Sequence, residues 1–153
     1  MIKHIFHSPI VICLAFCVPL LTNCGKSPGC WGEDKNSGII ERSIDIPCPY
    51  INSAERVVIT SDSVYRKYFD TLYCKPPTID FNASSLLGLT ARGGCTMKMK
   101  RAVTINTETR EFVYKVLAKD CGVCRKSVIS YNWVLVPKIP EDWAVKFELE
   151  EKQ

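Results

Sequence analysis

The feature that most constrains the fold is a short apolar run near the N-terminus, because it decides which residues fold at all. Residues 10–21 form an uncharged, apolar run of 12 residues, and Lys3 precedes it. Such a run is shorter than the roughly 20 residues of a transmembrane helix and is typical of a secretory signal peptide. The alternative, a buried core helix, is disfavoured by the extreme N-terminal position and by Pro19. We therefore expect residues 1–23 to be removed.

The residues at the end of this run indicate a lipid anchor. Leu21-Thr22-Asn23-Cys24 resembles the bacterial lipobox, Leu-small-small-Cys, although Asn23 departs from the usual Gly, Ala or Ser. The resemblance implies that Cys24 carries acyl chains such as palmitate, and each buried CH₂ contributes about 0.8 kcal/mol to membrane binding. A conventional signal peptide without lipid is the rival interpretation. We expect a lipid-anchored protein of the bacterial cell envelope, at the outer membrane.

Export also determines how the cysteines are read. Six cysteines remain after Cys24, and an even number in an exported chain indicates a disulfide framework: Cys30, Cys48, Cys74, Cys95, Cys121 and Cys124. The CxxC formed by the last two is also compatible with thiol redox chemistry, which needs the first cysteine at a helix N-terminus. Residues 127–136 instead have a strand composition. A zinc site would need a second close cysteine pair.

Charge and histidine content argue against several functions. The chain has 20 Lys+Arg and 16 Asp+Glu, a mild net charge of +4 that does not suggest nucleic-acid binding. Both histidines, His4 and His7, lie in the expected signal peptide. The mature chain then lacks Ser-His-Asp and Cys-His catalysis and histidine-based metal sites. A carboxylate pair remains formally possible, but the acidic residues near the C-terminus have the pattern of a turn and a solvated strand. We expect no enzyme activity, metal or cofactor.

The mature chain divides into a tether and one domain. Residues 24–36 are polar, with Gly, Ser and Pro, and predict a lipid-proximal tether. Residues 37–153 predict a single globular domain, starting with strands at 39–46 and 56–60. Ser61 is a candidate N-cap for a helix to about Tyr73, because apolar residues recur there at helical spacing.

The rest of the domain has the pattern of strands. Extended stretches are predicted at 79–81, 84–91, 127–136 and 145–150, and the one at 127–136 is apolar on both faces, as in a central strand. Residues 95–105 and 111–118 alternate and predict a hairpin turning near Glu108. The predicted fold is α+β: one helix packed on a mostly antiparallel, twisted sheet of six or seven strands, with disulfides as staples.

The hairpin also predicts a disulfide pairing. Symmetry about its turn places Cys95 opposite about residue 121, within reach of a disulfide. We therefore expect Cys95 to bond Cys121, or Cys124 if the register slips. The unused CxxC member would bond Cys74, and Cys30 would bond Cys48. A direct Cys121–Cys124 bond is the main rival.

Three sequence pieces carry a family resemblance: Ile79-Asp80-Phe81, Gly93-Gly94-Cys95 and Asn132-Trp133-Val134-Leu135-Val136-Pro137. Across about residues 56–150, their order is similar to that of small uncharacterised lipoproteins of the Bacteroidetes. It also distantly resembles the PrcB family, lipoproteins that stabilise a surface protease complex. The resemblance implies a non-enzymatic, protein-binding module.

Two other functions stay open at this stage. The chain could be a carbohydrate- or ligand-binding surface lipoprotein, because Trp31, Trp133 and Trp143 can stack on sugar rings. Trp133 lies in the doubly apolar strand and is expected in the core, whereas Trp143 follows a Pro-containing corner and is the better exposed candidate. A thiol-redox protein using Cys121 and Cys124 is the third.

Overall fold

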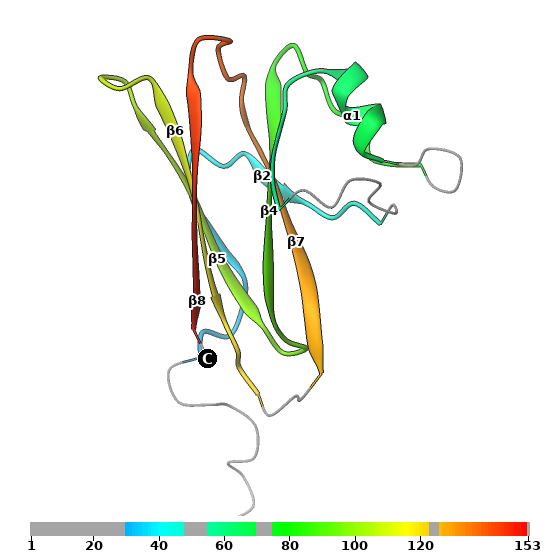
Figure 1. The fold of residues 1–153 in the computed structure, drawn as a ribbon, viewed down its shortest axis with the longest axis vertical. Coiled ribbons are helices and arrows are strands. Elements are labelled where there is room, and N and C mark those ends of the chain that lie inside the picture. Colours follow the sequence, from blue (N-terminus) through cyan, green and yellow to red (C-terminus); the bar gives the residue numbers. More distant parts are fainter. Residues whose placement is uncertain (1–29, 48–54, 70–74, 123–125, 153) are drawn as a thin grey trace, which may run out of the picture.

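Eight strands and one short helix make up the described part of the chain. The structure is a computed structural model, and it describes residues 30–47, 55–69, 75–122 and 126–152 (Figure 1). The elements, in chain order, are β1 (Lys35–Gly38), β2 (Arg42–Ile44), β3 (Arg56–Ile59), α1 (Asp62–Tyr68), β4 (Ser84–Gly94), β5 (Lys98–Asn106), β6 (Glu111–Lys119), β7 (Ser127–Pro137) and β8 (Ala144–Lys152).

The strands form two sheets of four. Sheet A has the order β1-β5-β6-β8, with β1 parallel to β5 and β8 parallel to β6. Sheet B has the order β2-β7-β4-β3 and is antiparallel throughout. The expected single sheet of six or seven strands is therefore wrong, although the predicted helix does pack on a sheet. The physical reason lies in β4 and β7, whose apolar residues on both faces need a packing layer on each side.

Two cores fill the spaces between three layers. The first lies between the sheets and includes Leu87 and Leu89 of β4, Tyr114 and Val116 of β6, and Val134 of β7. The second lies on the opposite face of sheet B, where the helix layer covers it: Val57, Ile59, Tyr65, Phe69, Phe81, Leu86, Trp133 and Leu135. Figure 1 shows α1 beside sheet B, on the side away from sheet A. The central position predicted for residues 127–136 is confirmed, because β7 lies between β2 and β4.

Trp133 is a core residue, as predicted, with 5% of its surface exposed. It pairs with Gly88 across the β4–β7 ladder, and a Cβ at position 88 would collide with the indole ring. The ring of Phe69 meets the same indole edge-on, with centroids 5.4 Å apart. Gly88 therefore provides the space in which sheet B and the helix layer join.

The helix begins where predicted but ends early. Ser61 is its N-cap, and its hydroxyl accepts a hydrogen bond from the Val64 N–H. The helix ends at Tyr68, and Phe69 is extended, so the prediction of a helix to about Tyr73 is wrong. Phe69 leaves the helical conformation with its ring packed between Tyr65 and Trp133. Residues 70–74 lie outside the described part of the chain.

The predicted hairpin is confirmed and consists of β5 and β6. Lys98 pairs with Lys119, and continuation of this register places Cys95 opposite Gly122, one residue from the prediction. The turn works without glycine because Arg110 adopts the left-handed conformation, with φ of 53°. The Asn106 carboxamide oxygen also accepts hydrogen bonds from the backbone N–H groups of Glu108 and Thr109.

Of the predicted first strand at 39–46, residues 42–44 form a strand, which is β2 of sheet B. The preceding strand, β1, belongs to sheet A, and the chain crosses between the sheets at residues 39–41. Gly38 permits the crossing, because its φ is +73° and a Cβ there would collide with the Val103 carbonyl. Ile39 and Ile40 then pack against the core between the sheets.

Candidate functional site

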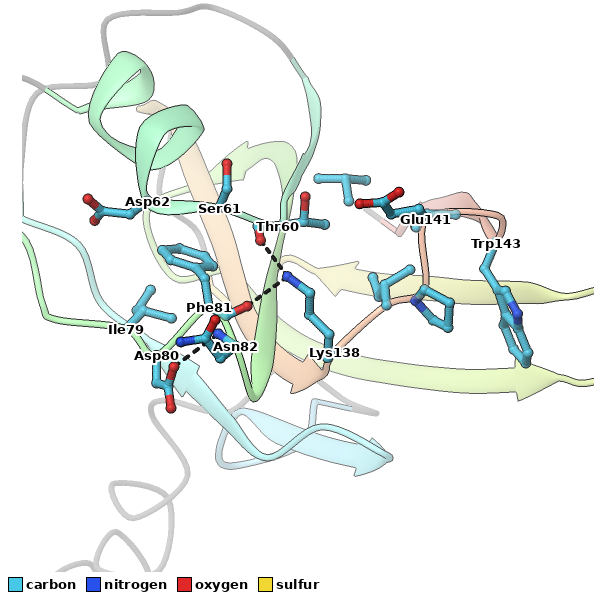
Figure 2. Close-up of a pocket in the computed structure, with 14 residues that line it drawn as sticks. Thr60, Ser61, Asp62, Ile79, Asp80, Phe81, Asn82, Lys138, Glu141 and Trp143 are labelled. Carbon is cyan, nitrogen blue, oxygen red and sulfur yellow. Dashed lines mark hydrogen bonds between the residues drawn. The ribbon is translucent and has the colours of Figure 1, made fainter.

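A pocket of about 830 Å³ lies at one end of the molecule, where three segments meet. The segments are the junction between β3 and α1, the turn before β4, and the loop from β7 to β8 (Figure 2). Residues 58–62, 79–82 and 138–145 contribute its lining. These segments meet because β3, β4 and β7 are neighbours in sheet B, so that their connections leave the sheet at the same end.

Lys138 fastens the three segments to one another. Its ammonium donates to the Thr60 carbonyl at 2.6 Å and to the Phe81 carbonyl at 2.7 Å. Its backbone N–H donates to the Ala83 carbonyl at 2.9 Å. Figure 2 shows the lysine side chain reaching from the β7–β8 loop toward Thr60 and Phe81. Lys138 therefore has a structural role as the floor of the pocket.

The pocket wall combines carboxylates with apolar and aromatic surface. Its acidic residues are Asp62, Asp80 and Glu141. Asp62 forms an ion pair with Arg66 at 2.8 Å, and Asp80 accepts a hydrogen bond from the Asn82 N–H at 2.9 Å. The apolar part of the wall comprises Val58, Ile79, Phe81, Ile139, Pro140, Trp143 and Val145. Such a wall suits a ligand that has both apolar and hydrogen-bonding groups.

Trp143, the candidate binding residue from the sequence, is one of the residues that line this pocket. It is half-buried, and its ring meets Phe112 edge-on with centroids 5.6 Å apart. Its backbone N–H donates to the Pro140 carbonyl at 3.1 Å, which fixes the corner before β8. The indole also packs against the core between the sheets, so Trp143 is less exposed than the sequence predicts. Figure 2 shows it on the side of the pocket away from Asp80.

The disulfides differ from the predicted pairing. Cys30 bonds Cys121, with Cα atoms 5.5 Å apart, so the pairs Cys95–Cys121 and Cys30–Cys48 and the rival Cys121–Cys124 are all wrong. The cause is β1, whose parallel pairing with β5 takes residues 30–34 to the end of sheet A where β6 finishes. Cys121 is therefore bonded to Cys30 in this structure, and the thiol-redox interpretation, which uses Cys121 and Cys124, stays a prediction.

Cys95 is also disulfide-bonded, and its partner lies outside the described residues. The predicted alternative of Cys124 as that partner falls on such a residue, as do Cys48, Cys74 and the lipidation candidate Cys24. The described part of the expected tether, residues 30–36, is attached to sheet A by more than the disulfide. Asp34 accepts from the Met99 N–H at 3.0 Å and pairs with Arg101 at 3.0 Å.

Sequence reasoning missed most of the pocket. From the sequence, Asp80 was only part of a motif that carries a family resemblance, and residues 137–140 were only a turn. Lys138 gave no signal, because its two carbonyl partners are 78 and 57 residues away in the sequence. Within the described ranges, no three Asp, Glu, Cys or His side chains gather as metal ligands would.

No known family model, curated protein or solved structure matches the chain in the comparisons with known proteins. Among the described residues, no helix is both long and apolar enough to cross a membrane.

Proposed function

We propose that this protein is an exported lipoprotein of the bacterial cell envelope, anchored through Cys24 at the outer membrane, that binds a protein partner and has no enzymatic role. The apolar run and lipobox-like residues at its N-terminus support export and anchoring. The absence of histidine after residue 7 supports a role outside catalysis. The distant resemblance to protease-stabilising lipoproteins favours a protein as the partner.

The observation that carries the proposal is the position of the pocket beside an edge strand. β3 is the last strand of sheet B, and Val58 and Thr60 at its end line the pocket. No described strand pairs with the outer edge of β3. An extended peptide can add to such an edge through main-chain hydrogen bonds, while a neighbouring pocket selects its side chains. Val58, 37% exposed, lies where such a peptide side chain would enter.

The position of the anchor supports the same proposal. Cys121 follows the end of β6, whereas the pocket lies near the start of that strand, where the Ala144 N–H donates to the Arg110 carbonyl. A nine-residue strand is about 30 Å long. Figure 1 shows the ends of β6 and β8 at the bottom of the molecule and α1 at the top. A chain held through Cys30 would thus direct the pocket away from the membrane.

A photocrosslinking amino acid at position 58 in the native envelope tests this proposal. We expect ultraviolet light to produce one covalent adduct that mass spectrometry identifies as a protein. The matched control is the same amino acid at Ile105, which is 40% exposed but lies near the β5–β6 turn, outside the pocket lining. No protein adduct from position 58, or the same adducts from both positions, would contradict the proposed interface.

A carbohydrate ligand is the second candidate, and Trp143 is the observation that favours it. An indole face together with Asp80, Asn82 and Glu141 offers a stacking surface and hydrogen-bonding groups of the kind that sugars require. A screen of the purified protein against immobilised envelope polysaccharides distinguishes the two candidates. Binding that Trp143→Ala abolishes, without loss of the adduct at position 58, would assign the pocket to a sugar.

A further inference from the structure

The outer face of sheet A carries a cluster of lysines at the end nearest Cys30. Lys98 of β5 pairs in register with Lys119 of β6, which pairs with Lys152 of β8. One step along the same face, Lys35 of β1 pairs with Lys100 of β5. The side chains share the outer face, because the residues that alternate with them on β5 and β6, such as Met99 and Ala118, are buried in the core. We call these five lysines the lysine patch.

The acidic residues near the patch do not balance its charge. Glu150 forms an ion pair with Lys152 at 2.9 Å, and Glu33 is exposed in the preceding segment. Asp34 points the other way and pairs with Arg101, whose side chain is 11% exposed. Among the residues that the structure describes, the lysines of the patch thus outnumber the carboxylates beside them. Further along the same face, Lys115 and Lys146 instead lie within 4.0 Å of glutamates.

Like charges on directly opposite strand positions destabilise a sheet, so the row of Lys98, Lys119 and Lys152 needs an explanation. An external anion bound beside the row would reduce this repulsion. The face is also open, since no described helix or strand packs on it. Trp31 lies at its margin, with the Lys100 ammonium 4.2 Å from the ring centroid. A tryptophan beside lysines is the combination that membrane–water interfaces favour.

We propose that the lysine patch binds the anionic headgroups of the membrane that holds the anchor, so that the end of sheet A beside Cys30 meets the bilayer surface. This inference rests on the proposed lipidation of Cys24. Only residues 25–29 separate Cys24 from Cys30, and a chain of that length reaches about 20 Å at most. The Cys30–Cys121 bond fixes the near end of this connection beside the patch. The patch is therefore within reach of the headgroups, which carry the complementary charge.

Vesicle co-sedimentation of the unlipidated mature chain tests the patch separately from the anchor. The protein is residues 24–153 with Cys24→Ser, and it contains every strand, the helix and both cores of the described structure. The probes are vesicles of phosphatidylcholine alone and vesicles containing phosphatidylglycerol at about one lipid in three. Each lysine near an anionic surface changes the affinity about fivefold. We expect strong preference for the anionic vesicles, decreasing as salt screens the charges.

Two triple variants with equal net charge give the matched comparison. Lys35→Gln/Lys98→Gln/Lys100→Gln should weaken binding to anionic vesicles on the order of 100-fold. Arg56→Gln/Lys67→Gln/Lys75→Gln removes the same charge from β3, from α1 and from the segment before β4, none of which belongs to sheet A, and should weaken it less than about fivefold. Circular dichroism on both variants checks that the fold is retained.

Three results would overturn the proposed binding of the patch to headgroups. They are equal binding to both kinds of vesicle, equal loss of vesicle binding in the two variants, and tighter binding to a single-stranded oligonucleotide than to the anionic vesicles. The mass of Cys24 in the native protein is a separate measurement of the anchor. A native protein with a lipid mass whose unlipidated form ignores anionic vesicles would refute the patch and leave the proposed anchoring intact.

Discussion

The outer faces of the two sheets are built in opposite ways. The outer face of sheet B lies under α1 and presents Trp133, Leu135 and Leu86 to the helix layer. The outer face of sheet A has no described helix or strand over it and carries lysines and glutamates on β6 and β8. The difference is visible in the strands themselves. β7 is buried at five consecutive residues, 132–136, whereas β6 alternates between buried and accessible residues along most of its length. Whether one or both faces of a strand are covered therefore follows from its own pattern of buried residues.

The largest expected effect comes from breaking the covered face. Trp133→Ala removes the indole that packs between Gly88 and Phe69. Truncation of a buried tryptophan lowers the free energy of unfolding by about 3–5 kcal/mol. Leu117→Ala on the outer face of sheet A is the matched control, because that side chain is only half-buried. We expect a cost of about 1 kcal/mol or less there. Denaturant unfolding measures both. Similar losses of stability in the two variants would contradict the difference in burial between the outer faces of the two sheets.

A somewhat smaller effect should follow from releasing β1. Cys30→Ser/Cys121→Ser removes a bond that spans 91 residues of sequence, and native disulfides contribute about 2–4 kcal/mol. Because the bond holds residues 30–38 against β5, hydrogen exchange should rise first in β1 and in residues 100–103 of β5. Sheet B should stay protected. Non-reducing peptide mapping checks that Cys95 keeps its own disulfide. A loss below about 0.5 kcal/mol would show that β1 binds without the staple.

Local periodicity explains the correct sequence predictions. The helix start at Ser61, the β5–β6 hairpin and the burial of Trp133 all depend on residues close together in the sequence or on one strand's own pattern. Capping, turn position and alternation are read directly at that scale. The predictions that failed depend on contacts between distant segments. An alternating strand has the same sequence pattern in one sheet of seven strands as in one of two sheets of four, so the division between sheets A and B was not readable.

The pocket and the disulfide failed for the same physical reason. Cys30 meets Cys121 only because β1 pairs in parallel with β5, and a parallel pairing leaves no local turn signal. Lys138 bonds two carbonyls whose own residue types are irrelevant to the contact. Backbone acceptors of this kind leave no trace in the composition. Trp143 was singled out because it follows a proline-containing corner, and it does line the pocket, but its ring packs against Phe112 and the core between the sheets, so it is less exposed than predicted.

Alkaline titration sharpens the comparison at the helix layer. Burial against sheet B, followed by the nearby Asp62 charge, raises the pKa of Tyr65 from 10.0 to about 12. The unfolded chain therefore loses this proton near pH 10 while the folded protein keeps it, so stability is full below pH 10 and falls between pH 10 and about 12. Tyr65→Phe should lose about 1 kcal/mol at neutral pH, because the hydroxyl donates to the Pro77 carbonyl at 3.0 Å.

The stability of Tyr65→Phe should therefore fall less steeply than that of the wild type as the pH rises from 10 to about 12. Leu135→Ala is the control, since Leu135 lies in the same core as Tyr65 and has no titratable group. We expect it to lower the stability at every pH and to leave the alkaline slope unchanged. An unaltered slope in Tyr65→Phe would show that Tyr65 does not set the alkaline limit of the helix layer. Thermal melts at several pH values provide the measurement.

The smallest effect is expected at the β5–β6 turn, which belongs to the uncovered sheet. Arg110 has a left-handed backbone, which costs a residue with a Cβ about 1–2 kcal/mol. Its guanidinium pairs with Asp142 at 2.7 Å, but both side chains are exposed, so the pair contributes about 1 kcal/mol at most. In Arg110→Gly, relief of the backbone strain offsets loss of the ion pair with Asp142, and we expect the free energy of unfolding to change by no more than about 1 kcal/mol. Arg110→Val loses the same pair and keeps the strain, so it should be the less stable of the two. Urea unfolding of both variants gives the ordering, and a valine variant as stable as the glycine variant would show that the turn relaxes away from the left-handed conformation.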